Sequence, residues 1–300
     1  MTKKIVVTGI GATSPLGGTA LSSWDALLAG ESGIHTLEHD WVAQYDLPVT
    51  FAGEAKVRPS DVLERVESKR LDPSAQFALI SAREAWADAG SPDVDPLRVG
   101  VDYSTGIGGL WTLLDAWDTL REKGPRRVLP MTIPMLMPNA AAAAISMSIP
   151  SRAYARTDVS ACASSTEAIA NAYVHLQAGL ADVVIAGGTE AVVHPLPIAS
   201  FAAMQALSKR NDDPTTASRP YDVTRDGFVL GEGAGTVVLE TEEHALARGA
   251  RIYAELAGGS VTSDSYHITA PDPEGSAAAH SRRSSRSSRC TTARLPRRST

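Results

Sequence analysis

Apolar runs of strand character alternate with longer segments of helical periodicity over most of the chain. Short apolar runs favour strands, whereas apolar residues that recur every three or four positions favour helices. Strands are therefore expected at Ile5–Ile10, Val99–Tyr103, Ala153–Val159, Val183–Ala186, Thr236–Glu240 and Arg251–Ala257. Helices are expected at Leu21–Ala29, Ser74–Ala89, Leu110–Arg121, Asn139–Ser148, Glu167–Leu180, Ile198–Leu207 and Glu242–Arg248. This alternation predicts a layered α/β fold.

The helix expected at Glu167–Leu180 has a clear apolar stripe, and a glycine, Gly179, stands near its end. The stripe consists of Ile169, Ala172, Leu176 and Leu180. The following segment, Asp182–Ala186, is apolar after its first residue, as expected of a strand that is covered on both faces.

The composition is that of an ordinary globular protein, with 43% hydrophobic and 21% charged residues among 300. The chain has two cysteines, Cys162 and Cys290, so no disulfide framework is implied and a reducing cytoplasm fits. Residues 1–4 lead directly into an expected strand, without the pattern of a signal peptide. The apolar segment Ala140–Ile149 is too short to cross a membrane. We therefore expect a cytoplasmic protein with no membrane partner.

The last twenty residues differ in composition from the rest. Ser281–Thr300 holds seven Arg and no acid, so the first 280 residues carry 21 basic and 34 acidic side chains, a net charge of −13. A helical pattern that begins at Glu274 also stops after Ala279. One interpretation is a basic tail that binds RNA. We favour a shifted reading frame in a GC-rich gene, and expect no nucleic-acid partner.

The segment Val7–Ser14 hints at a dinucleotide-binding fingerprint. The third glycine of that fingerprint is missing, and Pro15 with Gly17 and Gly18 makes a turn where a nucleotide-binding helix should begin. We therefore interpret the segment as a strand followed by a turn, and expect no nicotinamide cofactor.

Cys162 is the residue most indicative of chemistry. It lies between a strand-like run and a helical run, among small residues that allow a sharp turn and leave its sulfur at the first turn of a helix. A thiol there faces the positive end of the helix dipole and unpaired N–H groups, a setting that favours the thiolate. Cys162 is therefore a candidate nucleophile that accepts an acyl group. A buried structural cysteine is the alternative that the local pattern leaves open.

Further motifs run in order along residues 1–279. They are Val6–Gly11, Ser104–Leu110, the Cys162 segment Asp158–Glu167, Ile185–Glu190, Ala206–Ser208, Arg219–Asp222, Arg225–Gly235 and Tyr266–Pro271. Together they resemble the β-ketoacyl-acyl carrier protein synthases of the elongating type I/II class, within the thiolase superfamily. The Arg-Asp-Gly-Phe and Gly-Glu-Gly-Ala-Gly sequences within Arg225–Gly235 are the most specific part of this resemblance.

The resemblance implies a thiolase-like, layered αβαβα fold built from two pseudo-equivalent halves. On this basis residues 1–250 correspond to the N-terminal half, residues 251–279 to the start of a C-terminally truncated second half, and residues 280–300 to the Arg/Ser-rich tail. The family is typically homodimeric, with the strand before Cys162 near the interface, so we expect a homodimer.

The resemblance also implies a reaction, that of a 3-oxoacyl-acyl carrier protein synthase in fatty acid biosynthesis. Cys162 would attack the thioester of an acyl-acyl carrier protein and hold the acyl chain. Malonyl-acyl carrier protein would then lose carbon dioxide, and its carbanion would attack the acyl-enzyme. The backbone N–H of Cys162 would help to stabilise the oxyanion. Acyl carrier protein, loaded with acyl or malonyl groups, is the expected partner, and neither a metal nor another cofactor is expected.

Other site residues follow from the same resemblance. Ile107, in the Gly-Ile-Gly-Gly turn, matches the position that lines the acyl pocket and limits chain length; a plain core isoleucine is the alternative. The basic patch that meets the acidic carrier protein would comprise Arg65, Lys69, Arg70, Arg126, Arg127 and Arg210. Such a patch would steer the partner electrostatically. Asp226 and its neighbouring glycines are expected to shape a loop near Cys162, and His267 to pack near the site.

The chain departs from the family pattern in one respect. Decarboxylation in this family relies on one His in a His-Gly-Thr segment and a second His that follows a Gly, and neither occurs in these 300 residues. His194, His267 and His280 stand in neither motif. We therefore expect that Cys162 can still be acylated, but that condensation is lost or severely impaired.

Two other functions remain open on the sequence. One is a ketosynthase of a type II polyketide pathway, which shares almost every motif. The other is an inactive remnant that only binds carrier protein through its basic patch. The related chain-length-factor subunits lack the cysteine, so Cys162 argues against that role.

Overall fold

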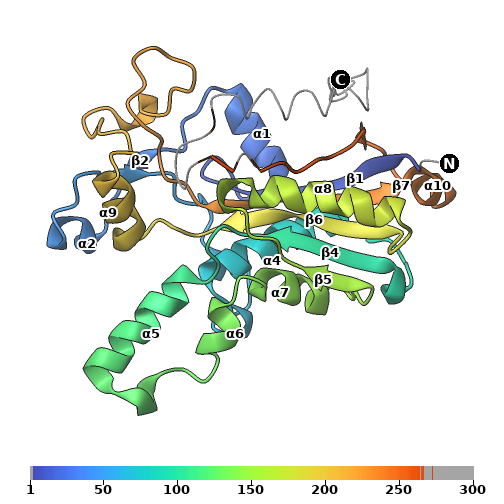
Figure 1. Ribbon diagram of the computed structural model, residues 1–300, viewed down its shortest axis with the longest axis horizontal. Helices are drawn as coiled ribbons and strands as arrows, with labels where there is room; N and C mark the ends of the chain where they lie inside the picture. The colour runs from blue at the N-terminus through green and yellow to red at the C-terminus, as the bar shows by residue number, and fades with distance from the viewer. Residues whose placement is uncertain (1–2, 264, 267–271, 273–300) are drawn as a thin grey trace.

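The structure is a computed structural model that describes residues 3–263, 265–266 and 272. Within these residues, a six-stranded mixed sheet has the order β5-β4-β6-β7-β1-β8 (Figure 1). The strands are β1 (Ile5–Thr13), β4 (Val99–Ser104), β5 (Tyr154–Arg156), β6 (Val183–Glu190), β7 (Gly233–Thr241) and β8 (Ala254–Leu256). β5, β4 and β6 run parallel, whereas β7 is antiparallel to β6 and β1, and β8 is antiparallel to β1.

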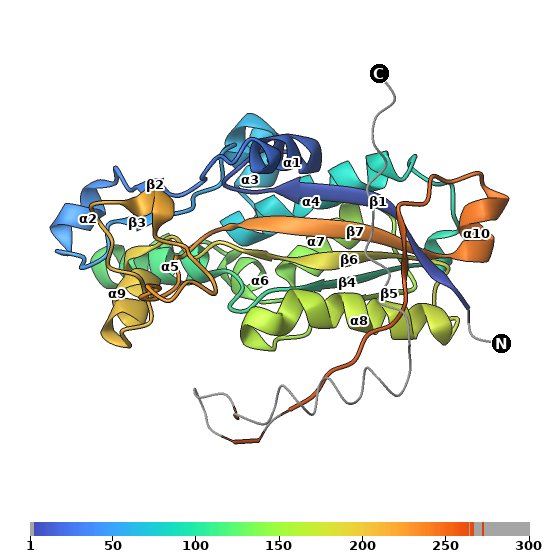
Figure 2. The ribbon, with the colours of Figure 1, turned by 90° about the horizontal axis from the view of Figure 1, so that it is seen from above.

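Helices cover both faces of this sheet. α4 (Pro73–Asp88) and α7 (Ala140–Ser148) pack on one face, and α8 (Ser164–Gln177) packs on the other (Figure 2). Alternate residues of β6 point to opposite faces of the sheet. Ile185 packs in the core under α4 and α7, and Val184 packs in the core under α8. Val183–Ala186 is therefore buried on both faces, as the sequence predicts.

Two glycines allow β1 to lie directly against α4. A β-carbon on Gly9 would lie 2.2 Å from the carbonyl oxygen of Ala85, and one on Gly11 would lie 2.1 Å from that of Ser81. A larger side chain at either position would push the helix off the strand. The Gly-x-Gly pattern thus lies within a continuous strand, which confirms the strand interpretation of this segment.

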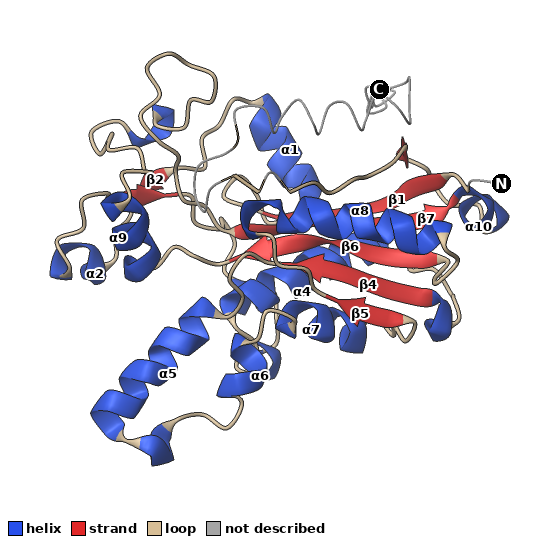
Figure 3. Cartoon of the chain, viewed as in Figure 1, coloured by secondary structure: helices blue, strands red, loops and turns tan. Residues whose placement is uncertain are grey.

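An arm and a lobe extend from the sheet (Figure 3). The arm consists of α5 (Leu110–Lys123), the short 3₁₀ helix η3 (Pro125–Arg127) and α6 (Thr132–Leu136). The lobe contains β2 (His35–Thr36), α2 (Asp40–Gln44), β3 (Phe51–Ala52) and α9 (Pro195–Ala203). It has its own apolar core, to which Phe51, Val193 and Ile198 contribute. The remaining elements are α1 (Ala20–Leu28), η1 (Pro59–Asp61), α3 (Arg65–Ser68), η2 (Pro96–Arg98), η4 (Ala161–Ala163), η5 (Pro214–Thr216) and α10 (Glu242–Ala247).

The strands and helices expected from the sequence are present, but several ends differ. The strand expected at Ala153–Val159 is confined to β5, because the Thr157 hydroxyl and the Asp158 N–H turn to bond β4 instead. The strand expected at Arg251–Ala257 shortens to β8. The helix expected at Ile198–Leu207 is α9, which begins earlier because the side chain of His194 caps it.

The sequence did not indicate α3, α6 or the small elements of the lobe. Within the part that the structure describes, no helix is both long and apolar enough to cross a bilayer. The expected tail at residues 280–300 lies outside the described residues, and so do His267 and His280. Of the expected segment 251–279, residues 264, 267–271 and 273–279 also lie outside them.

Candidate functional site

The carboxyl ends of three adjacent parallel strands meet at one edge of the sheet. The turn Thr105–Gly109 follows β4, the Cys162 segment follows β5, and Glu190 ends β6 (Figure 1). Ligands of open α/β sheets bind at such edges. This edge is therefore the candidate functional site.

Cys162 lies in η4, one turn ahead of α8, rather than in the first turn of the helix itself. It is a free and exposed cysteine, so the alternative of a buried structural cysteine is wrong. The residue before it, Ala161, has a φ of 51°, a left-handed conformation that is uncommon for a residue with a β-carbon. The turn around Cys162 is thus locally strained, as is frequent at functional sites.

Ser164 holds this turn closed. Its hydroxyl accepts a hydrogen bond of 2.9 Å from the Ser160 N–H and donates one of 2.7 Å to the Ala161 carbonyl. Asp158, before the turn, accepts a 2.8 Å hydrogen bond from the Asn171 amide on α8. The sulfur is therefore presented by a turn that is fastened on both sides.

The first turn of α8 sits directly on β6. A β-carbon on Gly188 would lie 1.9 Å from the Ser165 hydroxyl oxygen and 2.9 Å from the Ser104 carbonyl oxygen. A β-carbon on the preceding Gly187 would lie 2.1 Å from the carbonyl oxygen of Gly235 on β7. The paired glycines of Ile185–Glu190 therefore have steric roles: Gly188 lets the helix that follows Cys162 approach the sheet, and Gly187 leaves room for the backbone of β7.

The Gly-Ile-Gly-Gly turn lies beside the Cys162 turn. A β-carbon on Gly106 would lie 3.4 Å from the carbonyl oxygen of Ala161. Ile107 has 46% of its surface exposed, so it is not the plain core isoleucine that the alternative interpretation required. The backbone N–H of Gly109 donates to the Leu136 carbonyl (3.2 Å), which ties the turn to the arm.

The six basic residues expected to meet a carrier protein lie on three separate segments. Arg65, Lys69 and Arg70 are exposed on and just after α3 (Figure 2). Arg126 and Arg127 are exposed on η3, at the far end of the arm (Figure 1). Arg210 is half-buried after α9, where it pairs with Asp226 at 3.5 Å. A single chain therefore does not gather these side chains into one cluster.

A buried carboxylate that the sequence analysis missed lies under β5. Asp102 on β4 accepts a hydrogen bond from the Tyr154 hydroxyl and is paired with Nδ1 of His175, each at 2.9 Å. Burial raises the pKa of Asp102, although the contacts with His175 and Tyr154 oppose this. The three residues join β4, β5 and α8. No local motif signals them, because each comes from a different element.

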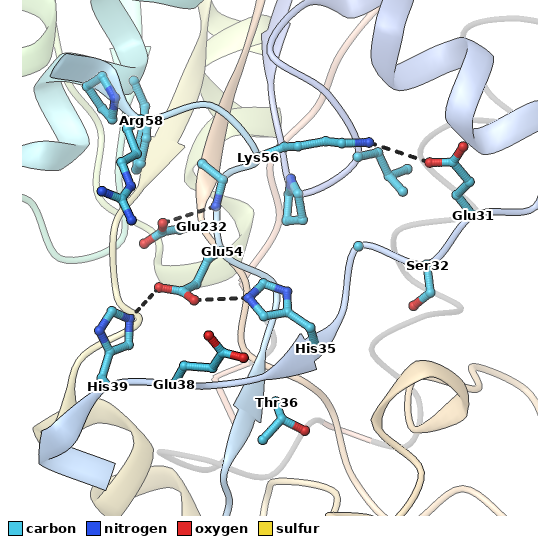
Figure 4. A pocket seen from close by; sticks show the side chains of 16 residues that line it. Glu31, Ser32, His35, Thr36, Glu38, His39, Glu54, Lys56, Arg58 and Glu232 are labelled. Carbon is cyan, nitrogen blue, oxygen red and sulfur yellow. Dashed lines mark hydrogen bonds and ion pairs between the residues drawn. The ribbon is translucent and has the colours of Figure 1, made fainter. Parts of the chain in front are cut away.

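A cavity of about 880 Å³ opens beside the lobe (Figure 4). Its lining comes from residues 15–59, Phe77 and Glu232, so it is separate from the Cys162 edge. The Glu54 carboxylate lies between two imidazoles, 3.0 Å from His35 Nε2 and 2.7 Å from His39 Nε2 (Figure 4). Burial favours a higher pKa of Glu54, but the hydrogen bonds and charges of His39 and His35 lower it overall.

Glu232, just before β7, faces the same cavity. Its carboxylate accepts a 3.1 Å hydrogen bond from the Ala55 N–H. Burial, with a smaller effect of the nearby Glu54 charge, raises the pKa of Glu232 to about 7. Within the described residues, no group of His, Cys, Asp and Glu side chains has the geometry to hold a metal ion.

The comparisons with known proteins agree with the geometry. The family described as "Beta-ketoacyl synthase, N-terminal domain" matches residues 2–245. The 3-oxoacyl-[acyl-carrier-protein] synthase 2 of Mycobacterium tuberculosis (strain ATCC 25618 / H37Rv) is 44% identical over 277 residues, which are 92% of this chain and 66% of that protein. The protein of the same name from Staphylococcus aureus (strain N315) is 44% identical over 276 residues, 91% of this chain and 66% of the relative.

Solved structures show the same likeness. A β-ketoacyl synthase from Burkholderia phymatum STM815 superposes with a TM-score of 0.79 at 33% identity, and the match covers 90% of this chain and 66% of that one. The structure of a type II PKS acyl-carrier protein in complex with its ketosynthase bound to the hexaketide gives a TM-score of 0.79 at 31% identity, covering 90% and 65%.

Helices layered on both faces of a mixed sheet, with a cysteine turn at the carboxyl ends of its parallel strands, are the features of the thiolase-like fold of condensing enzymes. Within that class, the chain belongs to the β-ketoacyl synthase family. It spans 66% of the length of the curated relatives that it matches.

Proposed function

We propose that this chain carries the acyl-accepting half of a 3-oxoacyl-acyl carrier protein synthase of fatty acid biosynthesis, with Cys162 as the nucleophile. The exposed thiol of Cys162, on a strained turn that is fastened ahead of α8, is the observation that carries this proposal. The curated relatives at 44% identity bear the name of that synthase.

The proposed step is an acyl transfer. The Cys162 thiolate attacks the carbonyl carbon of an acyl-acyl carrier protein thioester, a tetrahedral oxyanion forms, and the carrier protein leaves as its thiolate, which takes up a proton. The backbone N–H of Cys162 would donate to the oxyanion, and a donor of this kind is typically worth about 3–4 kcal/mol. Ile107, on the neighbouring turn, would line the acyl pocket.

Condensation with malonyl-acyl carrier protein is the second step of the proposed reaction. The 300 residues contain neither of the two His motifs that the family resemblance assigns to decarboxylation. We therefore propose that the chain by itself stops at the acyl-enzyme. The division into an N-terminal half (1–250), the start of a second half (251–279) and a tail (280–300) belongs to this same proposal.

Acyl carrier protein is the proposed partner, and a homodimer in the cytoplasm is the proposed form. A solved relative is a ketosynthase in complex with its acyl-carrier protein. The residues proposed to meet it are Arg65, Lys69, Arg70, Arg126, Arg127 and Arg210. Because they lie on separate segments, a second copy could place the arm of one chain beside α3 of the other. The short edge strand β5 and the exposed Trp117 and Ile133 of the arm support pairing of two copies.

Intact-mass spectrometry after incubation with an acyl-acyl carrier protein tests the proposal. We expect an acyl adduct on the wild-type chain and on the Cys290→Ser control, and none on Cys162→Ala. An absent adduct on a folded wild-type chain, or an adduct that persists in Cys162→Ala, would contradict the assignment. Addition of malonyl-acyl carrier protein should leave the adduct in place, because the chain lacks the two His motifs.

A ketosynthase of a type II polyketide pathway is the second candidate. The likeness to the type II PKS ketosynthase favours it, but that likeness has 31% identity, against 44% for the fatty acid synthases. Preference for a polyketide-loaded over a fatty-acyl-loaded carrier protein would reverse our choice. Binding of carrier protein without any adduct would instead indicate a remnant that only binds.

A further inference from the structure

Glu190 is a partly buried carboxylate at the end of β6 that the proposed reaction does not use. Its Oε1 accepts a 3.0 Å hydrogen bond from the Thr105 hydroxyl, and its Oε2 accepts one of 2.8 Å from the Gly106 N–H. The backbone N–H groups of Ile107 and Ala191 also stabilise its charge. Among the described residues, no basic side chain forms an ion pair with it. Glu190 is therefore held by the backbone of the Thr105–Ile107 turn rather than by a counter-charge.

This turn is the link between Glu190 and the Cys162 segment. A β-carbon on Gly106 would lie 2.9 Å from Glu190 Oε2 and 3.4 Å from the Ala161 carbonyl oxygen. The space beside the α-carbon of Gly106 is thus bordered both by the carboxylate and by the residue that precedes Cys162. Because the Gly106 N–H is bonded to the carboxylate, release of Glu190 would free the turn to shift relative to Ala161.

The same hydrogen bonds determine where Ile107 stands. While Thr105 donates to Glu190, its hydroxyl oxygen accepts a 3.1 Å hydrogen bond from the Gly108 N–H. The residues on both sides of Ile107 are therefore fastened, directly or through Thr105, to one carboxylate. The exposed side chain of Ile107 has no comparable anchor of its own within the described part of the chain.

We infer that Glu190 is a positioning residue that clamps the Thr105–Ile107 turn against the Cys162 segment and so limits the length of the acyl chain that the thiol accepts. This inference rests on the proposed function, and it acts on the same site. The ionised carboxylate is suited to the task because it only accepts hydrogen bonds, and the groups that face it are donors. A glutamine at this position has no charge and only one acceptor oxygen, so the hydrogen bonds that it can accept from the turn are fewer and weaker.

Alkylation of Cys162 with two synthetic probes tests the inference without a carrier protein. The probes are iodoacetamide and a long-chain N-alkyl iodoacetamide, and a Cys290→Ser background leaves Cys162 as the only thiol. The measured quantity is the ratio of the long-probe rate to the short-probe rate, followed by intact mass. We expect Glu190→Gln to raise this ratio about tenfold, since a misplacement of about 1 Å can change a rate by up to about 100-fold. Glu190→Asp, which keeps the acceptor, should restore part of the selectivity.

Glu84→Gln is the matched control. Glu84 is also a partly buried carboxylate that accepts backbone N–H groups, from Ala12 (2.8 Å) and Ala20 (2.9 Å), and burial raises its pKa as it does that of Glu190. It lies on α4, away from the Cys162 edge. Glu84→Gln should leave the probe ratio within about twofold of wild type. An equal ratio in Glu190→Gln and wild type would overturn the inference.

A double-mutant cycle with Ile107→Ala shows whether Glu190 acts through Ile107. If it does, Ile107→Ala alone should raise the ratio, and Glu190→Gln should add little in its presence. Fully additive effects would overturn the inference. An acyl adduct from acyl-acyl carrier protein tests the proposed function separately. A Glu190-dependent probe ratio with no such adduct would leave the clamp standing while the proposed function fails.

Discussion

Two carboxylates lie at the same end of neighbouring strands but have different hydrogen-bond partners. Glu190 ends β6 and pairs in register with Gly233, the first residue of β7, and Glu232 directly precedes that residue. Glu190 turns toward the Cys162 edge, where a hydroxyl and several backbone N–H groups meet it. Glu232 turns toward the cavity beside the lobe, where the Ala55 N–H donates to it and the Glu54 charge repels it.

Burial raises the pKa of both carboxyls, but their surroundings differ in how well they accommodate a charge. A carboxylate that accepts several N–H bonds can stay ionised without a cation. One that accepts a single bond beside a like charge becomes neutral near physiological pH, and the pKa of Glu232 accordingly rises to about 7. Similar burial is thus opposed by a hydroxyl and several backbone N–H groups at one strand end, but by a single N–H at the other, where the pKa of the carboxyl is about 7.

The largest effect on stability is expected from a substitution on β6, close to Glu190. Gly188→Ala places a β-carbon 2.7 Å from the Ser165 β-carbon and 2.9 Å from the Ser104 carbonyl oxygen, so α8 must move off β6. We expect the free energy of unfolding to fall by about 3 kcal/mol or more. Chemical denaturation measures this fall. Gly235→Ala is the control, because Gly235 pairs with Gly188 and an added β-carbon there meets nothing within 4 Å. Equal losses in both variants would show that the contact with α8 is unimportant.

The next effect is a gain in stability, which we expect when Glu232 is replaced. The folded pKa of Glu232 lies above its ordinary value of 4.5, so its ionisation opposes folding, and stability falls as the pH rises from about 4.5 to 7. Each unit of pKa is worth about 1.4 kcal/mol, so Glu232→Gln should stabilise the chain by about 3 kcal/mol at pH 8. The gain should shrink steadily toward pH 5.

Denaturation curves of both chains across that pH range measure this gain. Glu38→Gln is the control, because Glu38 lines the same cavity but is exposed. The free energy of unfolding of Glu38→Gln should stay within about 0.5 kcal/mol of wild type at every pH. A gain for Glu232→Gln that does not depend on pH would contradict a titrating carboxyl.

A smaller effect on stability is expected at His39, which pairs with Glu54 in the same cavity. His39→Ala removes the 2.7 Å partner of Glu54 and should cost about 1 kcal/mol at pH 7. Burial alone would raise the pKa of Glu54, but the two histidines lower it overall. The stability that the histidines contribute is therefore complete above the pKa of Glu54 in the unfolded chain, and it is lost as the pH falls through the lower pKa of Glu54 in the folded chain. His39→Gln retains a donor and should lose less. Thermal melts at pH 7 and near pH 4 compare the three chains; a cost that grows at low pH would refute the pairing.

The smallest effect is expected at the mouth of the cavity. Lys56 and Glu31 form an ion pair of 3.5 Å in which both side chains are more than half exposed. Lys56→Gln should therefore change the free energy of unfolding by less than about 0.5 kcal/mol, and added salt should abolish the difference. A loss above about 1 kcal/mol in a denaturation experiment would show that the pair is more than a surface contact.

Much of the central fold could be predicted from the sequence, because its signals are local. The apolar run Val183–Ala186 and the stripe of Glu167–Leu180 place β6 and α8 correctly within a few residues. Cys162 was found in the same way, from small residues between a strand-like and a helical pattern. The family resemblance then supplied roles for Ile107 and the basic residues, which remain proposals.

The small elements of the lobe and the arm escaped prediction for a physical reason. β2 and β3 have two residues each, which is too short for any periodicity to register, and they form because the lobe core encloses Phe51 and Ala52. The strand expected at Ala153–Val159 ended early because tertiary hydrogen bonds to β4 captured Thr157 and Asp158. The partners in these bonds lie 54 positions away in the sequence.

The sequence by itself determined which segments form the strands and main helices of the central sheet, where the chain turns sharply at Cys162, and to which family it belongs, since these follow from local pattern and motif. The tertiary structure alone decided which carboxylates meet which donors. Glu190 reaches Thr105 and Gly106 across 85 and 84 positions of sequence, and Glu232 reaches Ala55 across 177. The pKa and the role of a buried acid depend on such distant partners, because its charge is stabilised by what surrounds it in space.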